Sequence, residues 1–381
     1  MTVLVDEAVW PWRGRRWAHL VSDESYAELH GFAAELGIPR QVFQGDHYDV
    51  PAALRVRALE HGATPVAARE LVRRLRAAGL RLTAGQRRER RAEQEGWPQW
   101  RWDPLGRAWT VVAADRQDRP NLPATDCPFC PGGLEAPEPY DVRWFPNRWP
   151  ALPEQRAEVV LYTDDHAATF WSLGVDGAVK VIDLWAERTA ALGARDDVGY
   201  VLVFENRGPE VGATIAHPHG QIYAYPSVPT VPHAELDQSE CPFCDEGWQP
   251  PAERVVSSSG DWSAWTPSAS TWPYELLIAP DAHEADLPSL SSEGRRQMAT
   301  VLVDALARLD RLFDAPMPYM LWIHQRPTDG RAWPRAHLHV HVAPVLRKPG
   351  TLRYAAAAEQ GAGVFFNPVP PEAAAVALRE A

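Results

Sequence analysis

The tetrapeptide CPFC occurs twice in the chain, at 127–130 and 241–244, and it contains all four cysteines of the 381 residues. Two similar runs follow the copies, EVVLYTDDHAATFWSL and ELLIAPDAHEADLPSL, with His166 and His283 at matching places. The spacing between the copies is too long for a solenoid repeat and fits a duplicated domain. The chain is therefore expected to fold into two related units.

Each unit continues with a helical pattern, a strand-like run and a segment of alternating histidines. The segments are HPHGQIYAY at 217–225 and HLHVHVAPV at 337–345. Because side chains alternate along a strand, one face of each segment carries its histidines and Gln221. We predict an α+β fold with duplicated antiparallel sheets and helices packed on one face of each.

The residues before the repeat differ in character and include an amphipathic helical pattern at 64–79. We predict a small α/β domain at 1–95, a catalytic repeat at 96–232 and a second repeat at 233–381. The first segment holds several dispersed acids and histidines that could form a polar cluster: Asp6, His19, Asp23, Asp46, His47 and Asp49. Such residues are also common in surface loops, so the role of this segment stays open.

Composition excludes several classes of function. The net charge of -12 argues against a nucleic-acid binder, because such proteins neutralise phosphates with basic side chains. Only two lysines are present and the phosphate-binding P-loop pattern is missing, so neither P-loop nor lysine-nucleophile chemistry is expected. Since no apolar run approaches 18 residues, we expect no membrane partner and a cytoplasmic location.

The cysteine pairs predict two metal sites. Zinc takes four nitrogen or sulfur ligands, and thiolates two residues apart supply two of them from one turn. The first predicted zinc site consists of Cys127, Cys130, His166 and His217, and the second of Cys241, Cys244, His283 and His337. Four protein ligands leave no position for water, so both sites would be structural. A redox dithiol is the alternative interpretation.

His219 is the predicted nucleophile. With His217 bound to metal, the strand is fixed and His219 lies beside it on the same face. An imidazole held by a backbone carbonyl at one nitrogen can attack phosphorus with the other. Gln221 could stabilise charge on a phosphoryl oxygen, and Gly220 would let the phosphate approach the backbone. This chemistry is covalent nucleotidyl transfer.

From about residue 100 onward the chain resembles the galactose-1-phosphate uridylyltransferase family of the histidine-triad superfamily. The resemblance rests on WDPLGRAWTVVAADRQDRP, CPFC, FPNRWPAL, FENRG, HPHGQIYAY, MPYMLWIHQRP and HVHVAP. It implies a ping-pong reaction in which His219 takes the uridylyl group of UDP-glucose and galactose-1-phosphate then accepts it. It also implies a homodimer with the active site near the interface. Residues 1–95 resemble a small family of unassigned function.

The resemblance also implies roles for further residues. Those implied to bind substrate are Arg116, Arg119, Asn147, Asn206, Thr214 and Glu359. A second metal site, of iron or zinc, is implied at Glu235, His324, His339 and His341, as an alternative to the second cysteine site or beside it.

Three alternative functions remain open. The ending FNPVPPE also resembles a sister group that phosphorolyses ADP-glucose through an adenylylated histidine. A histidine-triad phosphohydrolase is disfavoured, because Gln221 cannot act as a general acid or base for water. A zinc-stabilised module without catalysis is the third.

Overall fold

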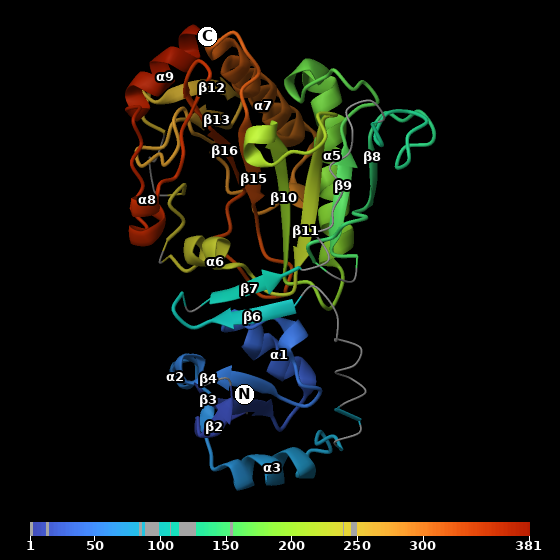
Figure 1. Cartoon of the computed structure of the whole chain (residues 1–381), viewed down its shortest axis with the longest axis vertical. Helices are drawn as coiled ribbons and strands as arrows, with labels where there is room; N and C mark the ends of the chain where they lie inside the picture. Colours follow the sequence, from blue (N-terminus) through green and yellow to red (C-terminus); the bar gives the residue numbers. More distant parts are fainter. Residues whose placement is uncertain are drawn as a thin grey trace.

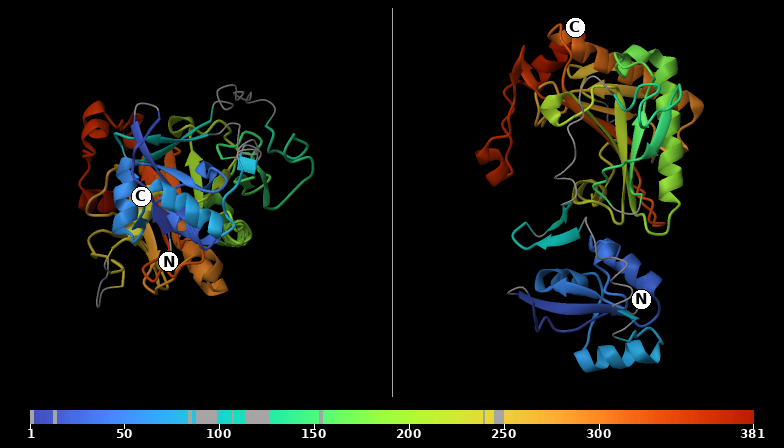
Figure 2. Two further views of the ribbon diagram at one scale, coloured as in Figure 1. Left: turned by 90° about the horizontal axis from the view of Figure 1, so that it is seen from below. Right: turned by 45° about the vertical axis from the view of Figure 1, so that its right-hand side comes forward.

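The computed structural model describes residues 3–12, 15–83, 86–87, 99–106, 108–113, 127–152, 155–238, 240–244 and 250–381. A five-stranded sheet and a nine-stranded sheet carry most of the fold. The small sheet lies at the N-terminal end of the molecule, and a β-hairpin separates it from the large sheet (Figures 1 and 2). None of the helices in the described ranges is long and apolar enough to cross a membrane.

The N-terminal part is a small mixed α/β unit. Its sheet has the order β2-β3-β1-β5, with β4 paired to β3, and only β1 and β5 are parallel. The strands are β1 (Val3–Val5), β2 (Trp10–Trp12), β3 (Arg15–Ser22), β4 (Tyr48–Pro51) and β5 (Thr64–Pro65). The helices are α1 (Tyr26–Glu35), α2 (Ala52–Glu60) and α3 (Ala68–Ala77).

Apolar side chains of β1 and β3 point alternately to the two faces of the small sheet. Both faces are therefore covered by buried apolar clusters. Leu20 packs with Leu29 and Phe32 of α1 on one face. Val21 packs with Leu71 and Leu75 of α3 on the other face. The helix predicted at 64–79 is confirmed over α3, where Leu71 and Leu75 lie one turn apart on the buried face, but Thr64–Pro65 form β5 instead.

The large sheet has the order β12-β13-β14-β16-β15-β10-β11-β9-β8, and all its neighbours are antiparallel. Its first half consists of β8 (Arg143–Pro146), β9 (Ala157–Leu161), β10 (Tyr200–Arg207) and β11 (His219–Tyr225). Its second half consists of β12 (Val255–Ser259), β13 (Trp262–Trp265), β14 (Leu276–Pro280), β15 (Tyr319–His324) and β16 (His339–Pro344).

Smaller elements connect and flank the large sheet. The strands are β6 (Gln99–Asp103), β7 (Ala108–Val112), β17 (Leu346–Lys348) and β18 (Thr351–Leu352). The helices are α5 (Gly174–Gly193), α6 (Thr230–Leu236), α7 (Ser292–Leu312), α8 (Ala357–Ala362) and α9 (Pro371–Glu380). Single 3₁₀ turns cover Arg40–Val42, Trp171–Leu173, Pro209–Val211 and Leu287–Ser289.

One apolar core joins the two halves. Val203 of β10 pairs with Ile323 of β15 at the centre of the sheet. Both are fully buried in a cluster that also contains Trp185 of α5 and Leu302 of α7. The two long helices lie on the same face of the sheet (Figure 1). The predicted α+β class, with antiparallel duplicated units and helices on one face, is confirmed.

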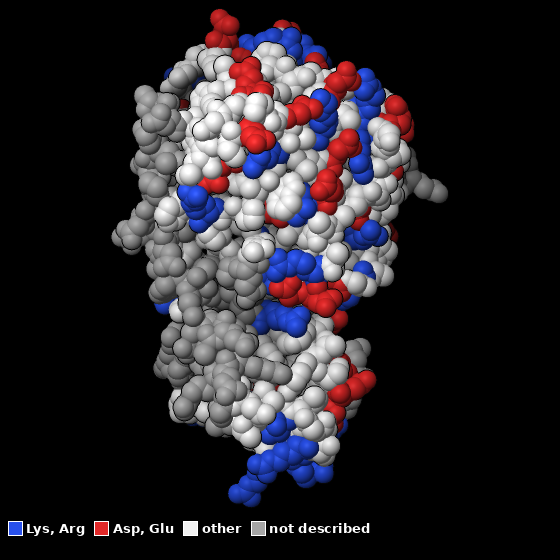
Figure 3. All heavy atoms as spheres, turned by 90° about the vertical axis from the view of Figure 1, so that its right-hand side faces the viewer, with Lys and Arg blue, Asp and Glu red and all other residues white. Residues whose placement is uncertain are grey.

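Strand β11 displays the period of two that the sequence predicts. Gly220 and Ile222 are buried toward the helices, whereas His219 and Gln221 are half-buried on the opposite face. Charged side chains lie at both ends of the molecule (Figure 3). On the face shown in Figure 3, acidic and basic side chains are interspersed.

Candidate active site and metal centres

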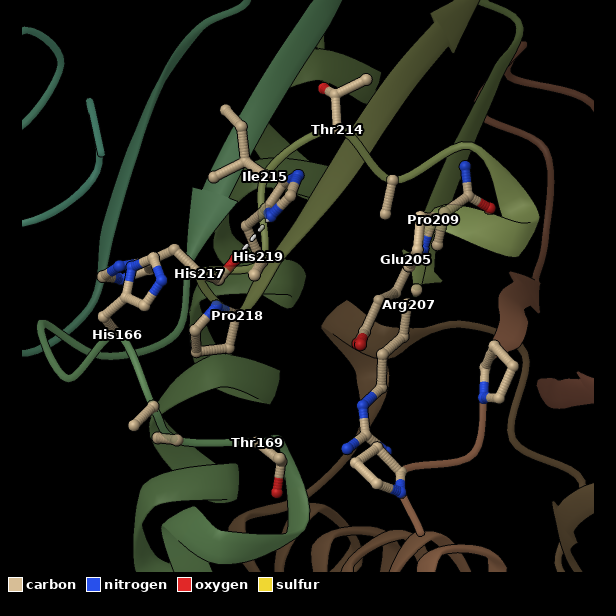
Figure 4. A pocket seen from close by; sticks show the side chains of 18 of the residues that line it. His166, Thr169, Glu205, Arg207, Pro209, Thr214, Ile215, His217, Pro218 and His219 are labelled. Carbon is tan, nitrogen blue, oxygen red and sulfur yellow. Dashed lines mark hydrogen bonds between the residues drawn. The ribbon is translucent and has the colours of Figure 1, made fainter. Parts of the chain in front are cut away.

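A cavity of about 670 Å³ opens where β10 ends and β11 begins (Figure 4). Its lining includes His219, Asn206 and Thr214, three residues that the sequence assigns to the active site. The volume is within the range of small-molecule sites. The cavity brings the predicted nucleophile together with two predicted substrate contacts.

The first cysteine cluster lies at the edge of this cavity. Donor atoms of Cys127, Cys130, His166 and His217 lie within 4.8 Å of one another. Cys130 Sγ is 3.5 Å from His166 Nδ1 and 3.6 Å from His217 Nδ1. Two thiols and two imidazoles are a donor set typical of zinc. The four predicted residues therefore fit a tetrahedral metal ion.

Outer contacts orient His217 toward that cluster. Its Nε2 lies 2.7 Å from the carbonyl oxygen of Thr163 and 2.8 Å from the Tyr140 hydroxyl. Donation through Nε2–H directs the Nδ1 lone pair at the thiols, as in many metal sites. Burial lowers the pKa of His217, which keeps the ring neutral as a ligand must be.

The ring of His219 is fixed by a backbone carbonyl. His219 Nδ1 lies 2.7 Å from the oxygen of His217, two residues earlier (Figure 4). A ring that donates through Nδ1–H carries its lone pair on Nε2. Because His217 also belongs to the cysteine cluster, one residue connects the metal site with the nucleophile. This is the acceptor that the sequence-based argument required.

Gln221 and Gly220 have distinct surroundings on opposite faces of β11. Asn147 Nδ2 donates to Gln221 Oε1 at 3.3 Å, which makes the amide nitrogen of Gln221 the atom that can donate. A Cβ built on Gly220 would collide with the hydroxyl of the buried Tyr162. The glycine is thus required by core packing, a reason that the sequence did not reveal, and its predicted contact with phosphate remains a prediction.

Two cavity residues were missed by the sequence-based assignment. Glu205 is buried at the cavity wall and accepts a hydrogen bond from Tyr319 at 2.9 Å. Burial raises the pKa of Glu205 to about 7. Arg207 lines the cavity and is paired bidentately with Asp310, at 2.6 and 2.9 Å. The motif FENRG contained both residues, but only their placement beside the cavity identifies them.

The second cysteine cluster repeats the geometry of the first. Cys241, Cys244, His283 and His337 bring their donor atoms within 4.8 Å. His337 Nδ1 is 3.5 Å from Cys241 Sγ and 3.4 Å from Cys244 Sγ. Its Nε2 lies 2.8 Å from the carbonyl oxygen of Pro280. Burial lowers the pKa of His337 to about 4, so the ring is neutral near pH 7.

A third cluster uses the next two histidines of the same segment, His339 and His341 at the start of β16. Glu235, His324, His339 and His341 also have donor atoms within 4.8 Å. His324 Nδ1 is 2.7 Å and His339 Nε2 is 3.5 Å from Glu235 Oε2. Burial acts to raise the pKa of Glu235, but hydrogen bonds from both rings hold it well below its usual value. The cluster shares no residue with the second cysteine site, so the structure forms both predicted alternatives.

Glu359 does not line the cavity of its own chain, and its predicted contact with the sugar stays a prediction. It is buried in α8, where the backbone amides of Ala356 and Phe366 donate to it at 2.7 and 2.9 Å, and Arg353 forms an ion pair with it. Helix α8 lies across the large sheet from β8 and β9 (Figure 1). The carboxylate is therefore held by groups of its own loop. The packing of the C-terminal residues that brings these groups together could not be predicted from the sequence. Arg116 and Arg119 lie outside the described residues.

Comparisons with known proteins cover the same parts of the chain. Residues 148–229 and 249–357 match the N- and C-terminal domains of galactose-1-phosphate uridyl transferase. Residues 3–78 match a family described as a protein of unknown function, DUF4031.

Curated relatives and solved structures agree with these matches. A galactose-1-phosphate uridylyltransferase from Thermotoga maritima is 37% identical, over 74% of this chain and 97% of that protein. One from Streptomyces lividans is 35% identical, over 68% of this chain and 79% of that protein. A solved structure of a uridylyltransferase mutant is 30% identical with a TM-score of 0.66, covering 74% of this chain and 96% of that one. The chain therefore belongs to the galactose-1-phosphate uridylyltransferase family.

Proposed function

We propose that the chain transfers a uridylyl group from UDP-glucose to galactose-1-phosphate through a covalent intermediate on His219. The observation that carries the proposal is the 2.7 Å hydrogen bond from His219 Nδ1 to the His217 carbonyl. It fixes the tautomer whose Nε2 lone pair can attack phosphorus. Membership in the family, with relatives named for this activity, supports the choice of substrates.

In the first step, Nε2 of His219 forms a bond to the α-phosphorus of UDP-glucose. The bond between that phosphorus and the bridging oxygen breaks, and glucose-1-phosphate leaves with the electron pair. In the second step, a phosphate oxygen of galactose-1-phosphate attacks the same phosphorus and the P–N bond breaks. UDP-galactose is released and His219 returns to its starting tautomer.

Neighbouring groups would stabilise the charge that develops during both steps. Gln221 is held by Asn147 at 3.3 Å, which directs its amide nitrogen as a donor to a phosphoryl oxygen. Asn206 and Thr214 line the cavity and are proposed to contact the nucleotide. The first cysteine cluster would hold a structural zinc ion that fixes His217 and, through its carbonyl, the ring of His219. The proposal includes a cytoplasmic homodimer, and zinc or iron at the Glu235 cluster.

The test is a panel of donors and acceptors combined with trapping of the intermediate. UDP-glucose with galactose-1-phosphate is compared with ADP-glucose and inorganic phosphate, and each donor is labelled at the α-phosphorus. Turnover of the first pair with label on the parent protein but not on His219→Ala is expected. Turnover of ADP-glucose alone would move the chain to the sister activity. Rapid hydrolysis of the donor without an acceptor would favour a phosphohydrolase.

A further inference from the structure

The N-terminal unit contains a side-chain cluster that the proposed transfer reaction does not use. Its members are His19, His47 and Asp49, whose ligand atoms lie within 4.8 Å of one another. His19 and Asp49 are directly opposite each other on β3 and β4, so their side chains share one face of the small sheet. His47 lies just before β4, at the end of the turn that leads into it.

The two imidazoles direct the same nitrogen at one carboxylate. Nε2 of His47 is 3.3 Å and Nε2 of His19 is 3.9 Å from Asp49 Oδ1. Ligands about 2.1 Å from a tetrahedral metal ion lie roughly 3.4 Å apart, so these separations match ligands of one ion. A neutral imidazole facing a carboxylate through its lone pair would be repelled. The arrangement therefore requires a cation between these atoms, either a proton or a metal ion.

Two buried carboxylates select the nitrogen that points inward. Asp6 Oδ2 is 2.7 Å from His19 Nδ1, and Asp46 Oδ1 is 2.5 Å from His47 Nδ1. Asp6 and Asp46 are 2% and 0% exposed, and burying a carboxylate is costly unless its contacts are satisfied. A carboxylate that accepts from the outer nitrogen of a ligating histidine is the usual outer contact of a metal site. Both histidines of this cluster have one.

The outer carboxylates are themselves held in place. The second oxygen of Asp46 accepts from the Leu82 amide at 3.0 Å and from Arg81 at 3.2 Å. Asp6 also accepts from the His19 amide at 2.6 Å. Such a supported arrangement is more than a chance group of surface acids. Asp23, which the sequence grouped with these residues, lies apart and pairs with Arg74.

We propose that His19 Nε2, His47 Nε2 and Asp49 Oδ1 bind a divalent first-row transition-metal ion. The side chains of His19 and Asp49 are 26% and 34% exposed, so the ion would face solvent on one side. Three protein ligands with an open side are typical of sites that bind water or a substrate oxygen. The cysteine clusters, by contrast, supply four protein ligands. The N-terminal unit would thus carry a metal centre of its own kind.

The test compares metal binding by variants of the full chain. Each protein is stripped of metal and titrated with Co²⁺, and bound ions are counted after equilibrium dialysis. Thiolate-to-cobalt absorption reports the cysteine clusters separately, because the proposed site contains no sulfur. His19→Ala and Asp49→Asn are expected to bind one ion fewer while keeping the full thiolate absorption. His61→Ala, an exposed histidine of the same unit, is the control and should bind as the parent does.

A fourth variant tests the outer contacts. Asp6→Asn keeps all three ligands but removes the charged acceptor of His19, so it should retain the ion with about 10- to 100-fold weaker affinity. Asp49→Asn preserves side-chain volume and covers the case in which His19→Ala does not fold. Equal ion counts and equal affinities in the parent, His19→Ala, Asp49→Asn and His61→Ala would overturn the proposal. The cation between the rings would then be a proton.

Discussion

In each half of the large sheet, a strand histidine bonds through Nδ1 to the carbonyl of the histidine two residues earlier. His219 bonds to His217 at 2.7 Å and His339 bonds to His337 at 2.8 Å. Each earlier histidine in turn belongs to a cysteine cluster. In both halves, a backbone carbonyl next to a cysteine cluster therefore holds the imidazole in the same tautomer, with the proton on Nδ1.

The neighbours of the two rings differ. Two residues after His219 stands Gln221, whereas two residues after His339 stands His341. His324 lies directly opposite His339. In the first half, Phe204 lies opposite Gln221, and Asn206 lines the same cavity as His219. Amides thus lie near one ring, and imidazoles with Glu235 lie near the other. Under the proposed function, these surroundings would decide between a nucleophile and a metal ligand.

The strongest way to break this comparison is to remove each ring in turn. His219→Ala is expected to lower uridylyl transfer by roughly 10⁴-fold or more, because no other group can form the covalent intermediate. His339→Ala should cost less than about 100-fold, since it removes only a ligand of the Glu235 cluster. Steady-state rates and α-phosphorus labelling provide the measurement. Equal losses in the two variants would show that the halves do not divide these roles.

The cysteine clusters can be compared by Cys130→Ser and Cys244→Ser. Each change should release about one metal ion and lower the free energy of unfolding by about 4 kcal/mol, because a structural metal stabilises only the folded state. Cys130→Ser should also reduce transfer more, since its cluster includes His217. Metal content, thermal unfolding with and without a chelator, and activity are measured together. A melting temperature that a strong chelator leaves unchanged would contradict the structural role.

A single substitution, Gln221→His, gives the first half the residue that the second half has at the matching position, His341. Gln221→His is expected to lower transfer by about 100-fold, because the amide donor held by Asn147 is lost. It should also raise the share of donor that is hydrolysed, because an imidazole can act as a base toward water. Product ratios with and without galactose-1-phosphate measure both effects. An unchanged ratio would mean that Gln221 does not separate transferase from hydrolase chemistry.

The buried Glu205 sharpens the contrast through pH. The pKa of Glu205 is raised to about 7, so between its ordinary value of 4.5 and 7 only the unfolded chain is ionised there. The free energy of unfolding should therefore fall as pH rises through this window, by up to about 3 kcal/mol. Glu205→Gln should remove that dependence, as measured by denaturant unfolding from pH 5 to 7.5. Glu210→Gln, an exposed change at the same cavity, should keep the slope of the parent.

The smallest expected effect concerns the residue after each histidine, which is Gly220 in the first half and Val340 in the second. Gly220→Ala should cost about 1 to 2 kcal/mol, because the added Cβ meets the Tyr162 hydroxyl. Adding Tyr162→Phe to this variant should recover part of the loss, as a double-mutant cycle would show. Additive losses in the cycle would exclude this contact as the cause.

Much of this fold could be predicted because the signals are local or duplicated. The period of two in HPHGQIYAY and the repeated CPFC pairs predicted strand β11 and the composition of both cysteine clusters. The class of fold followed from the helical patterns that became α5 and α7. These features depend on spacing along the chain, which the sequence displays directly.

Features that depend on tertiary packing could not be predicted. Three contacts within its own loop hold Glu359 in α8, and its predicted contact with the sugar stays a prediction. The burial of Glu205 and the collision at Gly220 depend on residues that are distant in sequence. The six polar residues of the N-terminal unit were recognised as a group, but only pairing of β3 with β4 separates ligands, outer carboxylates and the unrelated Asp23.

The pairing of β10 with β15 has a consequence for how the protein is made. Val203 cannot pair with Ile323 until the ribosome has synthesised the second half. Until then, the edge of β10 that pairs with β15 stays unpaired. An open strand edge is a template for association with other chains. The nascent first half would therefore depend on chaperones or on rapid translation, and expressing it alone should yield aggregates. Duplication has thus produced a protein whose earlier-made half is completed by the later one.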